Sequence, residues 1–170
     1  MSKTRGFSLV EMLIVLSILT IALSFAAPSF GDFIAKQRIQ TAFDNLNGAI
    51  HQARSTAALT GRSVSLAATS GDWAKGWSLF YDANNDGIRQ EHEELISVHE
   101  ALQDIQVLAD STTRRYIHYV PAGYSIQKSG AFHAGNLAIC GKSARGYKIV
   151  INRAGRIRHE TAATSELCPG

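Results

Sequence analysis

The sequence is poor in cysteine and proline, and its positive and negative charges nearly cancel. Two cysteines in 170 residues are too few for a disulfide-dense scaffold or a four-thiolate zinc site. Three prolines and 14 glycines exclude a collagen-like or proline-rich linker protein. With 45% hydrophobic and 18% charged residues, the chain is not intrinsically disordered, and its length allows one domain of ordinary size.

Motifs typical of enzymes are also missing from the sequence. No nucleophile is accompanied by a recognisable base, no two carboxylates are paired in a pocket context, and no loop has the spacing of a phosphate cradle. The six histidines show no spacing typical of a metal site or a catalytic triad. We therefore predict that the protein is not an enzyme and needs no cofactor, apart from one weak calcium candidate.

The longest apolar segment lies at the N-terminus. Residues 7–27 contain one charged side chain, Glu11, and at about 1.5 Å per residue they would span the ~30 Å hydrocarbon core of a bilayer. Lys3 and Arg5 precede the segment and favour a cytoplasmic N-terminus. A signal peptide cut after Ala26, a plain membrane anchor and a prepilin all fit this pattern. Only the prepilin needs the carboxylate, which is costly in an apolar helix without a partner.

The run KTRGFSLVE at residues 3–11 resembles the class III leader of type IV pilins and type II secretion pseudopilins. In that family the prepilin peptidase cuts after the glycine, here Gly6, and the new N-terminal residue, here Phe7, is N-methylated. The resemblance implies that Glu11 neutralises the N-terminal amine of a neighbouring subunit and sets the register of assembly. It also implies a single-pass protein of the bacterial inner membrane, with a periplasmic C-terminal domain, in or near a type IV pilus.

The helical pattern continues beyond the apolar segment and becomes amphipathic. Pro28 can kink or locally melt the helix. Apolar residues then recur at spacings of three and four from Ile39 to Ala57, and Gly61 is a suitable helix end. We therefore predict one helix from about residue 7 to about residue 60.

The remaining sequence shows short strand-like segments separated by turn signals. The expected strands lie at residues 63–68, 77–81, 95–98, 105–108, 116–120, 125–127, 137–140, 147–152 and 156–158. A long helix followed by short antiparallel strands is an α+β layout, which agrees with the type IV pilin plan. The predicted segments are a cleaved leader, a transmembrane half-helix, an amphipathic half-helix and a β-rich domain, at residues 1–6, 7–28, 29–60 and 61–170.

One turn in the β region carries a calcium-like pattern. Asp82, Asn84, Asp86 and Glu93 fit a twelve-residue calcium loop with glutamate at the twelfth position. The flanking segments are predicted strands, whereas an EF-hand needs helices, and Asn and Asp favour turns without any metal. We favour a metal-free hairpin and keep calcium as the weaker alternative. A Gly-Trp strand leading into this Asp-x-Asn-x-Asp-Gly turn resembles the GspH/FimT branch of minor pilins and pseudopilins.

The two cysteines, Cys140 and Cys168, are predicted to form a disulfide. The chain beyond the membrane helix would face the periplasm, where disulfides persist. The bond would tie the C-terminal tail to the β domain and contribute about 3–4 kcal/mol in the chain-entropy model.

Charge is strongly segregated along the chain. Between Asp72 and Asp110, nine acidic residues accompany only two basic ones, whereas seven cations and no Asp or Glu lie between Lys128 and His159. Two alternatives explain this segregation. The segments form oppositely charged faces that pair with neighbouring subunits, or the basic segment binds a polyanion such as DNA.

The basic segment contains a predicted hairpin. Gly155 suits a positive-φ turn, and strand alternation places Arg156 and Arg158 on one face. The run Gly155–Arg158 resembles the Gly-Arg-x-Arg motif of FimT, a minor pilin implicated in DNA uptake, and implies DNA contacts at both arginines. We expect backbone binding without sequence specificity, because no recognition helix is evident. From charge and position alone we add Arg153, Lys148, Arg145 and Lys142.

The sequence leaves three functions open. The first is a minor type IV pilin, most similar to FimT, that binds double-stranded DNA and aids its uptake in natural transformation. The second is a structural minor pilin that primes pilus assembly, and the third is a GspH-like pseudopilin of type II secretion. The expected partners are double-stranded DNA, other pilins in a filament, the prepilin peptidase and the inner membrane.

Overall fold

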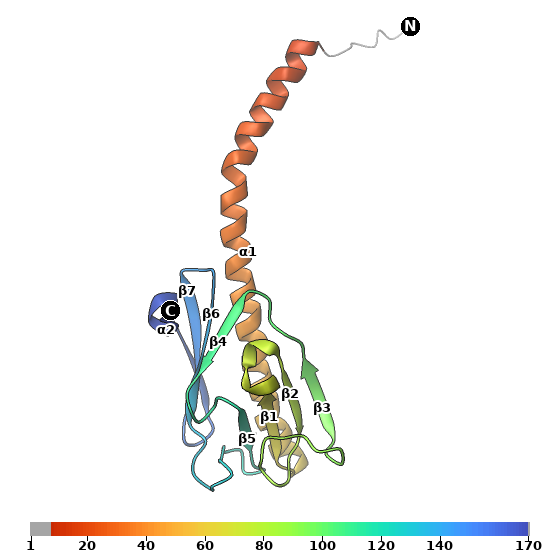
Figure 1. Cartoon of the computed structure of the whole chain (residues 1–170), viewed down its shortest axis with the longest axis vertical. Helices are drawn as coiled ribbons and strands as arrows, with labels where there is room; N and C mark the ends of the chain where they lie inside the picture. The colour runs from red at the N-terminus through yellow and green to blue at the C-terminus, as the bar shows by residue number, and fades with distance from the viewer. Residues whose placement is uncertain (1–7, 170) are drawn as a thin grey trace. The chain divides into compact units, whose positions relative to one another are not determined.

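The computed structural model describes residues 8–169, including their side chains except those of residues 25–29. Gly6 and Phe7, the predicted processing and methylation sites, lie outside the described residues. The chain divides into two compact units, Met1–Ile34 and Ala35–Gly170. Helix α1 (Leu9–Thr60) contributes to both units and is continuous through Pro28 (Figure 1).

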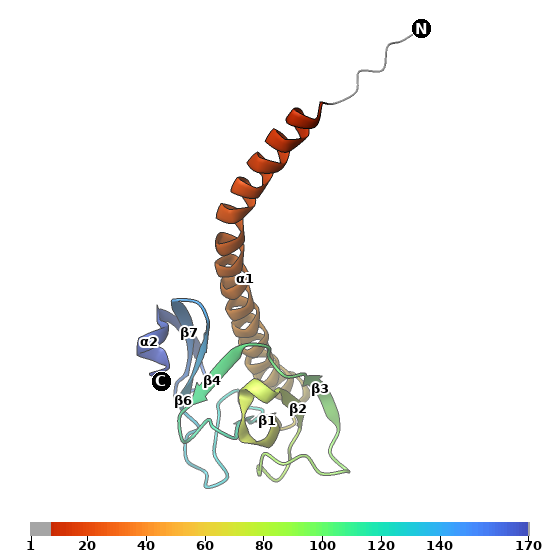
Figure 2. The same cartoon turned by 45° about the horizontal axis from the view of Figure 1, so that its top comes forward.

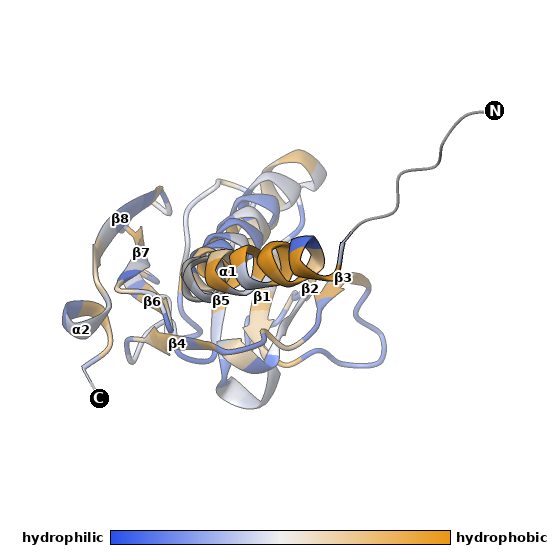
Figure 3. Ribbon diagram, turned by 90° about the horizontal axis from the view of Figure 1, so that it is seen from above, coloured by the Kyte–Doolittle hydropathy of each residue, from blue (hydrophilic) through white to orange (hydrophobic). Residues whose placement is uncertain are grey.

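In the first unit, α1 exposes its apolar side chains. The large hydrophobic residues from Leu9 to Leu23 are all more than half exposed, and Figure 3 shows orange apolar stretches along this helix. Within the described part of the chain, no helix combines the length and the apolar character that crossing a membrane requires. The transmembrane segment over residues 7–28 stays a prediction.

The second unit contains two four-stranded antiparallel sheets (Figures 1 and 2). The first sheet has the order β3-β2-β1-β5 and consists of β1 (Val64–Ala68), β2 (Trp77–Tyr81), β3 (Leu95–His99) and β5 (Tyr116–Tyr119). The second has the order β4-β6-β7-β8 and consists of β4 (Ile105–Ala109), β6 (Gly135–Gly141), β7 (Arg145–Ile151) and β8 (Ile157–Ala163). Three short helical turns complete the unit, η1 (Thr69–Gly71), η2 (Trp73–Lys75) and α2 (Thr164–Leu167).

One of the expected strands is wrong. Residues 125–127 form only isolated bridges, from Ser125 to Tyr119 and from Ile126 to Phe132. The other eight expected segments correspond to strands, although β8 continues to Ala163, well past its expected end. The antiparallel α+β plan is therefore confirmed.

The core of the second unit forms between the C-terminal half of α1 and the inward faces of both sheets. The buried helix positions repeat at helical period and include Ile39, Leu46 and Ile50. Because strand side chains alternate between faces, the opposite face of each sheet is left for polar and charged residues. The buried set from α1 is Ile39, Ala42, Phe43, Leu46, Ile50, Ala53 and Ala57.

The predicted disulfide is present in the second unit. Cys140 on β6 is bonded to Cys168, directly after α2, with their Cα atoms 6.5 Å apart. The bond fastens the C-terminal turn to the middle of the second sheet.

Candidate functional site

The turn between β7 and β8 is locked by one neutral side chain. The Asn152 amide oxygen accepts hydrogen bonds from the backbone N–H groups of Ala154 and Arg156, both at 2.9 Å. The N–H of Gly155 donates to the carbonyl of Asn152 at 2.9 Å, and the N–H of Asn152 donates to the carbonyl of Arg156 at 3.0 Å. The backbone that carries the arginines is therefore fixed without using any charged group.

Gly155 is required at this turn for two reasons. Its φ is +70°, and a Cβ at this position would lie 2.9 Å from both the Gly123 carbonyl oxygen and the Tyr124 Cα. The Tyr119 hydroxyl donates to the Gly155 carbonyl at 3.1 Å, and burial raises the pKa of Tyr119, which keeps this donor protonated. Any side chain at position 155 would push the turn away from its support.

Strand alternation places the β8 side chains as expected. Ile157 packs against the core, and the His159 ring lies 5.3 Å from that of Phe43 on α1. Arg158 is exposed on the other face, opposite Val150 of β7, and Arg156 is exposed just before the strand begins. The exposure of both arginines and the inward position of Ile157 agree with the predicted alternation, whereas a shared face for Arg156 and Arg158 stays a prediction.

The six predicted cations do not form one patch. Lys142 and Arg145 lie at the β6–β7 turn, whereas Arg153 and Arg156 lie at the β7–β8 turn. These turns are at opposite ends of the seven-residue strand β7, about 20 Å apart at the usual rise per residue. The structure therefore separates Lys142 and Arg145 from the hairpin.

Two of the cations have acidic partners that the sequence pattern did not reveal. Lys142 lies 3.6 Å from the carboxylate of Asp104, and Arg158 lies 2.5 Å from that of Glu160. Glu160 directly follows the acid-free span and sits opposite Lys148 in the β7–β8 register, so extending the charge count by one residue would have found it.

The basic hairpin still has free charge. Neither Arg153 nor Arg156 forms an ion pair with any described residue. We use the name basic hairpin for Arg153, Arg156 and Arg158 on the locked β7–β8 turn.

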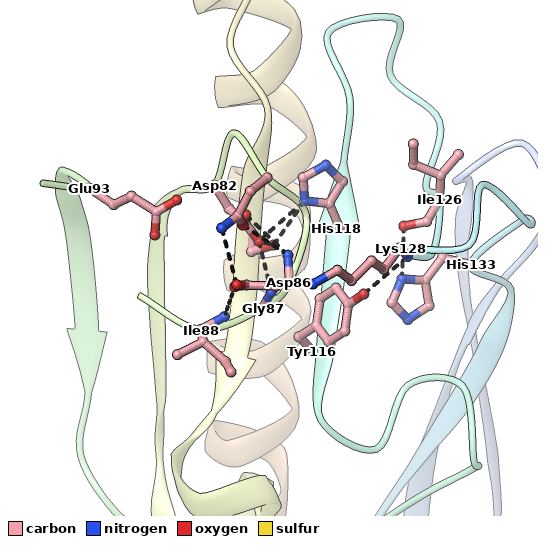
Figure 4. Close-up of polar contacts among 12 residues, drawn as sticks. Asp82, Asp86, Gly87, Ile88, Glu93, Tyr116, His118, Ile126, Lys128 and His133 are labelled. Atoms are coloured by element: carbon pink, nitrogen blue, oxygen red, sulfur yellow. Dashed lines mark hydrogen bonds and ion pairs between the residues drawn. The ribbon is translucent and has the colours of Figure 1, made fainter. Parts of the chain in front are cut away.

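The turn between β2 and β3 uses its charge internally (Figure 4). The Asp82 carboxylate is fully buried and accepts hydrogen bonds from the Ser65 hydroxyl at 2.6 Å and the Gly87 N–H at 3.0 Å. The His118 ring nitrogen Nδ1 lies 3.6 Å away. Burial alone would raise the pKa of Asp82, but interactions with His118, Ser65 and Gly87 outweigh it and lower the pKa to about 2.

Ser65, Asp82 and His118 are therefore a buried structural cluster. The Ser65 hydroxyl and the Asp82 carboxylate both approach the same ring nitrogen of His118, Nδ1. A catalytic triad instead uses the two ring nitrogens for different partners and exposes its nucleophile. Sequence spacing did not reveal this cluster, because its members come from three separate segments.

The calcium interpretation is not supported. Asn84 accepts the N–H of Asp86 at 3.1 Å, Asp86 accepts the N–H of Ile88 at 2.8 Å, and Glu93 accepts the N–H of Gln90 at 3.0 Å. Within the described residues, no three His, Cys, Asp or Glu side chains are placed to hold a metal ion. The flanking elements are strands, so hydrogen bonding within the hairpin accounts for the acidic pattern.

Glu11 lies in the first turn of α1. The Ser8 hydroxyl accepts the N–H of Glu11 at 3.2 Å, and a Glu11 carboxylate oxygen lies 3.5 Å from the N–H of Ser8. This reciprocal arrangement is a capping box. The role of Glu11 in assembly stays a prediction.

Comparison with known proteins identifies two matching families. The prokaryotic N-terminal methylation motif matches residues 1–27. The family described as type II transport protein GspH matches residues 42–155. No curated protein matches the sequence. The second match ends at Gly155, directly before the first arginine of the Gly-Arg-x-Arg run.

Solved structures support the fold. The type IV minor pilin FimU of Pseudomonas aeruginosa superposes with a TM-score of 0.58 at 23% identity, covering 74% of this chain and 90% of that chain. A second crystal form of FimU gives a TM-score of 0.56 at 25% identity and covers 71% and 91%. The minor pseudopilin EpsH of Vibrio cholerae gives only 0.49 at 12% identity, covering 72% and 96%. Because the GspH match spans more than half of the sequence, the chain belongs to the GspH family of minor pilins and pseudopilins.

Proposed function

We propose that this protein is a minor type IV pilin that binds double-stranded DNA through its basic hairpin and aids DNA uptake, as its resemblance to FimT implies. One observation carries the proposal: the hairpin backbone is locked by Asn152 and Gly155, while the guanidinium groups of Arg153 and Arg156 keep no acidic partner among the described residues. Arginine suits phosphate because its planar fork donates two parallel hydrogen bonds.

The proposed contacts read the DNA backbone. Phosphate contacts fix the position of a protein on a duplex but carry no sequence information. Each neutralised phosphate releases counterions, so the affinity should fall steeply with salt. We therefore expect binding that is independent of sequence and strongly dependent on ionic strength.

Membership of the pilin group supports the location and the other partners. We infer that the prepilin peptidase cuts after Gly6, that Phe7 is methylated, and that Glu11 pairs with a neighbouring pilin in the filament. Pilins are anchored in the inner membrane and associated with pili, and the Cys140–Cys168 bond suits an oxidising compartment such as the periplasm. Pilins and pseudopilins are structural proteins, in keeping with the prediction of a protein without enzymatic activity.

The experiment is a fluorescence anisotropy titration of a labelled DNA duplex with the full chain in non-ionic detergent, at several salt concentrations. Arg156→Gln with Arg158→Gln should weaken binding at least about tenfold and reduce the log–log salt slope by about 2. The matched control is Lys36→Gln with Arg38→Gln, which removes the same charge from α1. Equal affinities of the wild type and the hairpin variant at low salt would refute the proposal.

A structural role in filament assembly, as a minor pilin or as a pseudopilin of type II secretion, is the second candidate. The pairs Arg158–Glu160 and Lys142–Asp104 favour it, because they show that cations of this segment find carboxylates of the same protein. This role predicts that Arg156→Glu blocks incorporation into the filament. It also predicts that the wild type and the variant Arg156→Gln with Arg158→Gln bind DNA equally weakly.

A further inference from the structure

A second cluster of arginines lies on the other sheet. Arg89, Arg114 and Arg115 line a surface hollow of about 580 Å³ that is also lined by Phe80 of β2. No acidic side chain lines this hollow. Within residues 8–169 as described, none of the three arginine side chains forms an ion pair or a side-chain hydrogen bond. Three arginines therefore line a hollow that has no acidic side chain in its lining.

The backbone that carries Arg114 and Arg115 is fixed on both sides. One Asp110 carboxylate oxygen accepts the N–H groups of Thr112 and Thr113 at 3.1 and 3.0 Å, and their hydroxyls at 2.7 and 2.8 Å. The Trp73 ring N–H donates to the Thr113 carbonyl at 3.0 Å. On the other side, the carbonyl of Arg115 accepts the N–H of Ala68 on β1 at 2.9 Å.

The backbone at Arg89 is fixed by the acidic turn between β2 and β3. Asp82 and Asp86 accept the N–H groups of Gly87 and Ile88 (Figure 4). Gly87 has a φ of +67°, and a Cβ there would lie 2.3 Å from the Tyr116 ring, so the turn packs tightly on β5. The pattern that resembles a calcium loop therefore serves to hold the segment that carries an arginine.

Hydroxyl groups that can donate hydrogen bonds to an anion also line the hollow. Ser70 and Ser78 line the hollow beside the arginines. Ser70 has a φ of 54°, a left-handed conformation that is uncommon for residues other than glycine. Such conformations cost energy and concentrate at ligand sites and turns.

We propose that this hollow is a phosphate-binding site, separate from the basic hairpin and independent of its function. A phosphate group with two or more negative charges would relieve the repulsion among three guanidinium groups and would accept their paired hydrogen bonds. A carboxylate carries a single charge and offsets less of this repulsion. Hydrogen bonds hold the backbone around these arginines, so binding has to order only their exposed side chains. The charge comes either from a free phosphate compound with two or more charges or from several singly charged phosphates along one DNA backbone.

The test is isothermal titration calorimetry of inorganic pyrophosphate into the full chain in non-ionic detergent at low salt. We expect binding by the wild type, and at least a tenfold loss of affinity in Arg114→Gln with Arg115→Gln. The matched control, Lys36→Gln with Arg38→Gln, should bind as the wild type does, and all three proteins should share the same thermal midpoint. No binding by the wild type, or equal binding by the arginine variant, would overturn the proposal.

Two further arms keep this site distinct from the hairpin. If Arg156→Gln with Arg158→Gln abolishes pyrophosphate binding while Arg114→Gln with Arg115→Gln does not, the phosphate binds at the hairpin and the inference is wrong. If the Arg114 and Arg115 variant loses pyrophosphate and also binds duplex DNA more weakly, the site receives DNA phosphates. If only pyrophosphate binding is lost, the site takes a free phosphate compound.

Discussion

The acidic turn between β2 and β3 and the basic turn between β7 and β8 are both rich in charge, and side chains cap backbone N–H groups in both. In the acidic turn the charged groups are themselves the caps, because Asp82 and Asp86 accept N–H groups of the loop. In the basic turn the neutral Asn152 does the capping, and the arginines stay exposed. Charged side chains that form internal hydrogen bonds stabilise the fold. Charged side chains that are exposed and form no such bonds are available to a ligand.

The largest expected effect comes from removing the cap of the acidic turn. Asp82→Ala should destabilise the protein by about 3 kcal/mol, because Ser65, Gly87 and His118 lose a buried acceptor. The control is Glu91→Ala, an exposed acid of the same loop, which should change stability by less than about 0.5 kcal/mol. Urea denaturation measures both, and similar values for the two variants would mean that the acidic turn is not structural.

The same carboxylate should make stability depend on acid pH. The pKa of Asp82 is about 2 in the folded protein and ordinary in the unfolded chain, so the unfolded chain binds more protons as the pH falls. Stability should therefore be fully present above about pH 5 and decline by roughly 2 kcal/mol as the pH falls towards 2. Asp110 adds to this trend. Burial raises its pKa, but hydrogen bonds from Thr112 and Thr113 have the larger effect, so the pKa lies below its ordinary value. Denaturation of Asp82→Asn across this range should show a flatter profile, and an equally steep one would contradict the assignment.

The support of the basic turn can be separated from its charge. Gly155→Ala should lower stability by about 1–2 kcal/mol, because it adds a clash with Gly123 and Tyr124 to the strain of a positive φ. Gly130→Ala is the matched control, since Gly130 has a φ of +82° and nothing within 4 Å of the added Cβ. Thermal unfolding should rank Gly155→Ala below Gly130→Ala, and the reverse order would mean that the close packing at Gly155 is unimportant.

The smallest effect on stability should come from the exposed pair Arg158–Glu160. Glu160→Gln should change the free energy of unfolding by less than about 0.5 kcal/mol, because exposed ion pairs contribute little. The same change frees Arg158, so DNA affinity in the anisotropy titration should rise. A fall in DNA affinity would show that Glu160 orients Arg158 rather than competing for it.

Local periodicity predicted most of the fold. The buried stripe from Ile39 to Ala57 and eight of the nine expected strands follow the alternation of the sequence. The strand predicted at residues 125–127 does not form, because this segment makes only two isolated bridges, one to Tyr119 and one to Phe132. The disulfide was predictable because the sequence has only two cysteines and its β domain is expected in an oxidising compartment.

The sites were only partly predictable, because contacts between distant segments decide them. The basic hairpin is local, and its turn with a positive φ at Gly155 was predicted correctly. By contrast, Asp104 reaches Lys142, and the arginine hollow joins Arg89 to Arg114. No spacing rule connects such residues before the strand order is known.

The most direct test of the central claim measures two properties of one variant, Arg156→Gln with Arg158→Gln. If the arginines of the basic hairpin do not contribute to folding, the free energy of unfolding of this variant should stay within about 0.5 kcal/mol of the wild type. In the same protein, affinity for duplex DNA at low salt should fall at least about tenfold. Unchanged DNA affinity, or a stability loss as large as that of Asp82→Ala, would contradict the account.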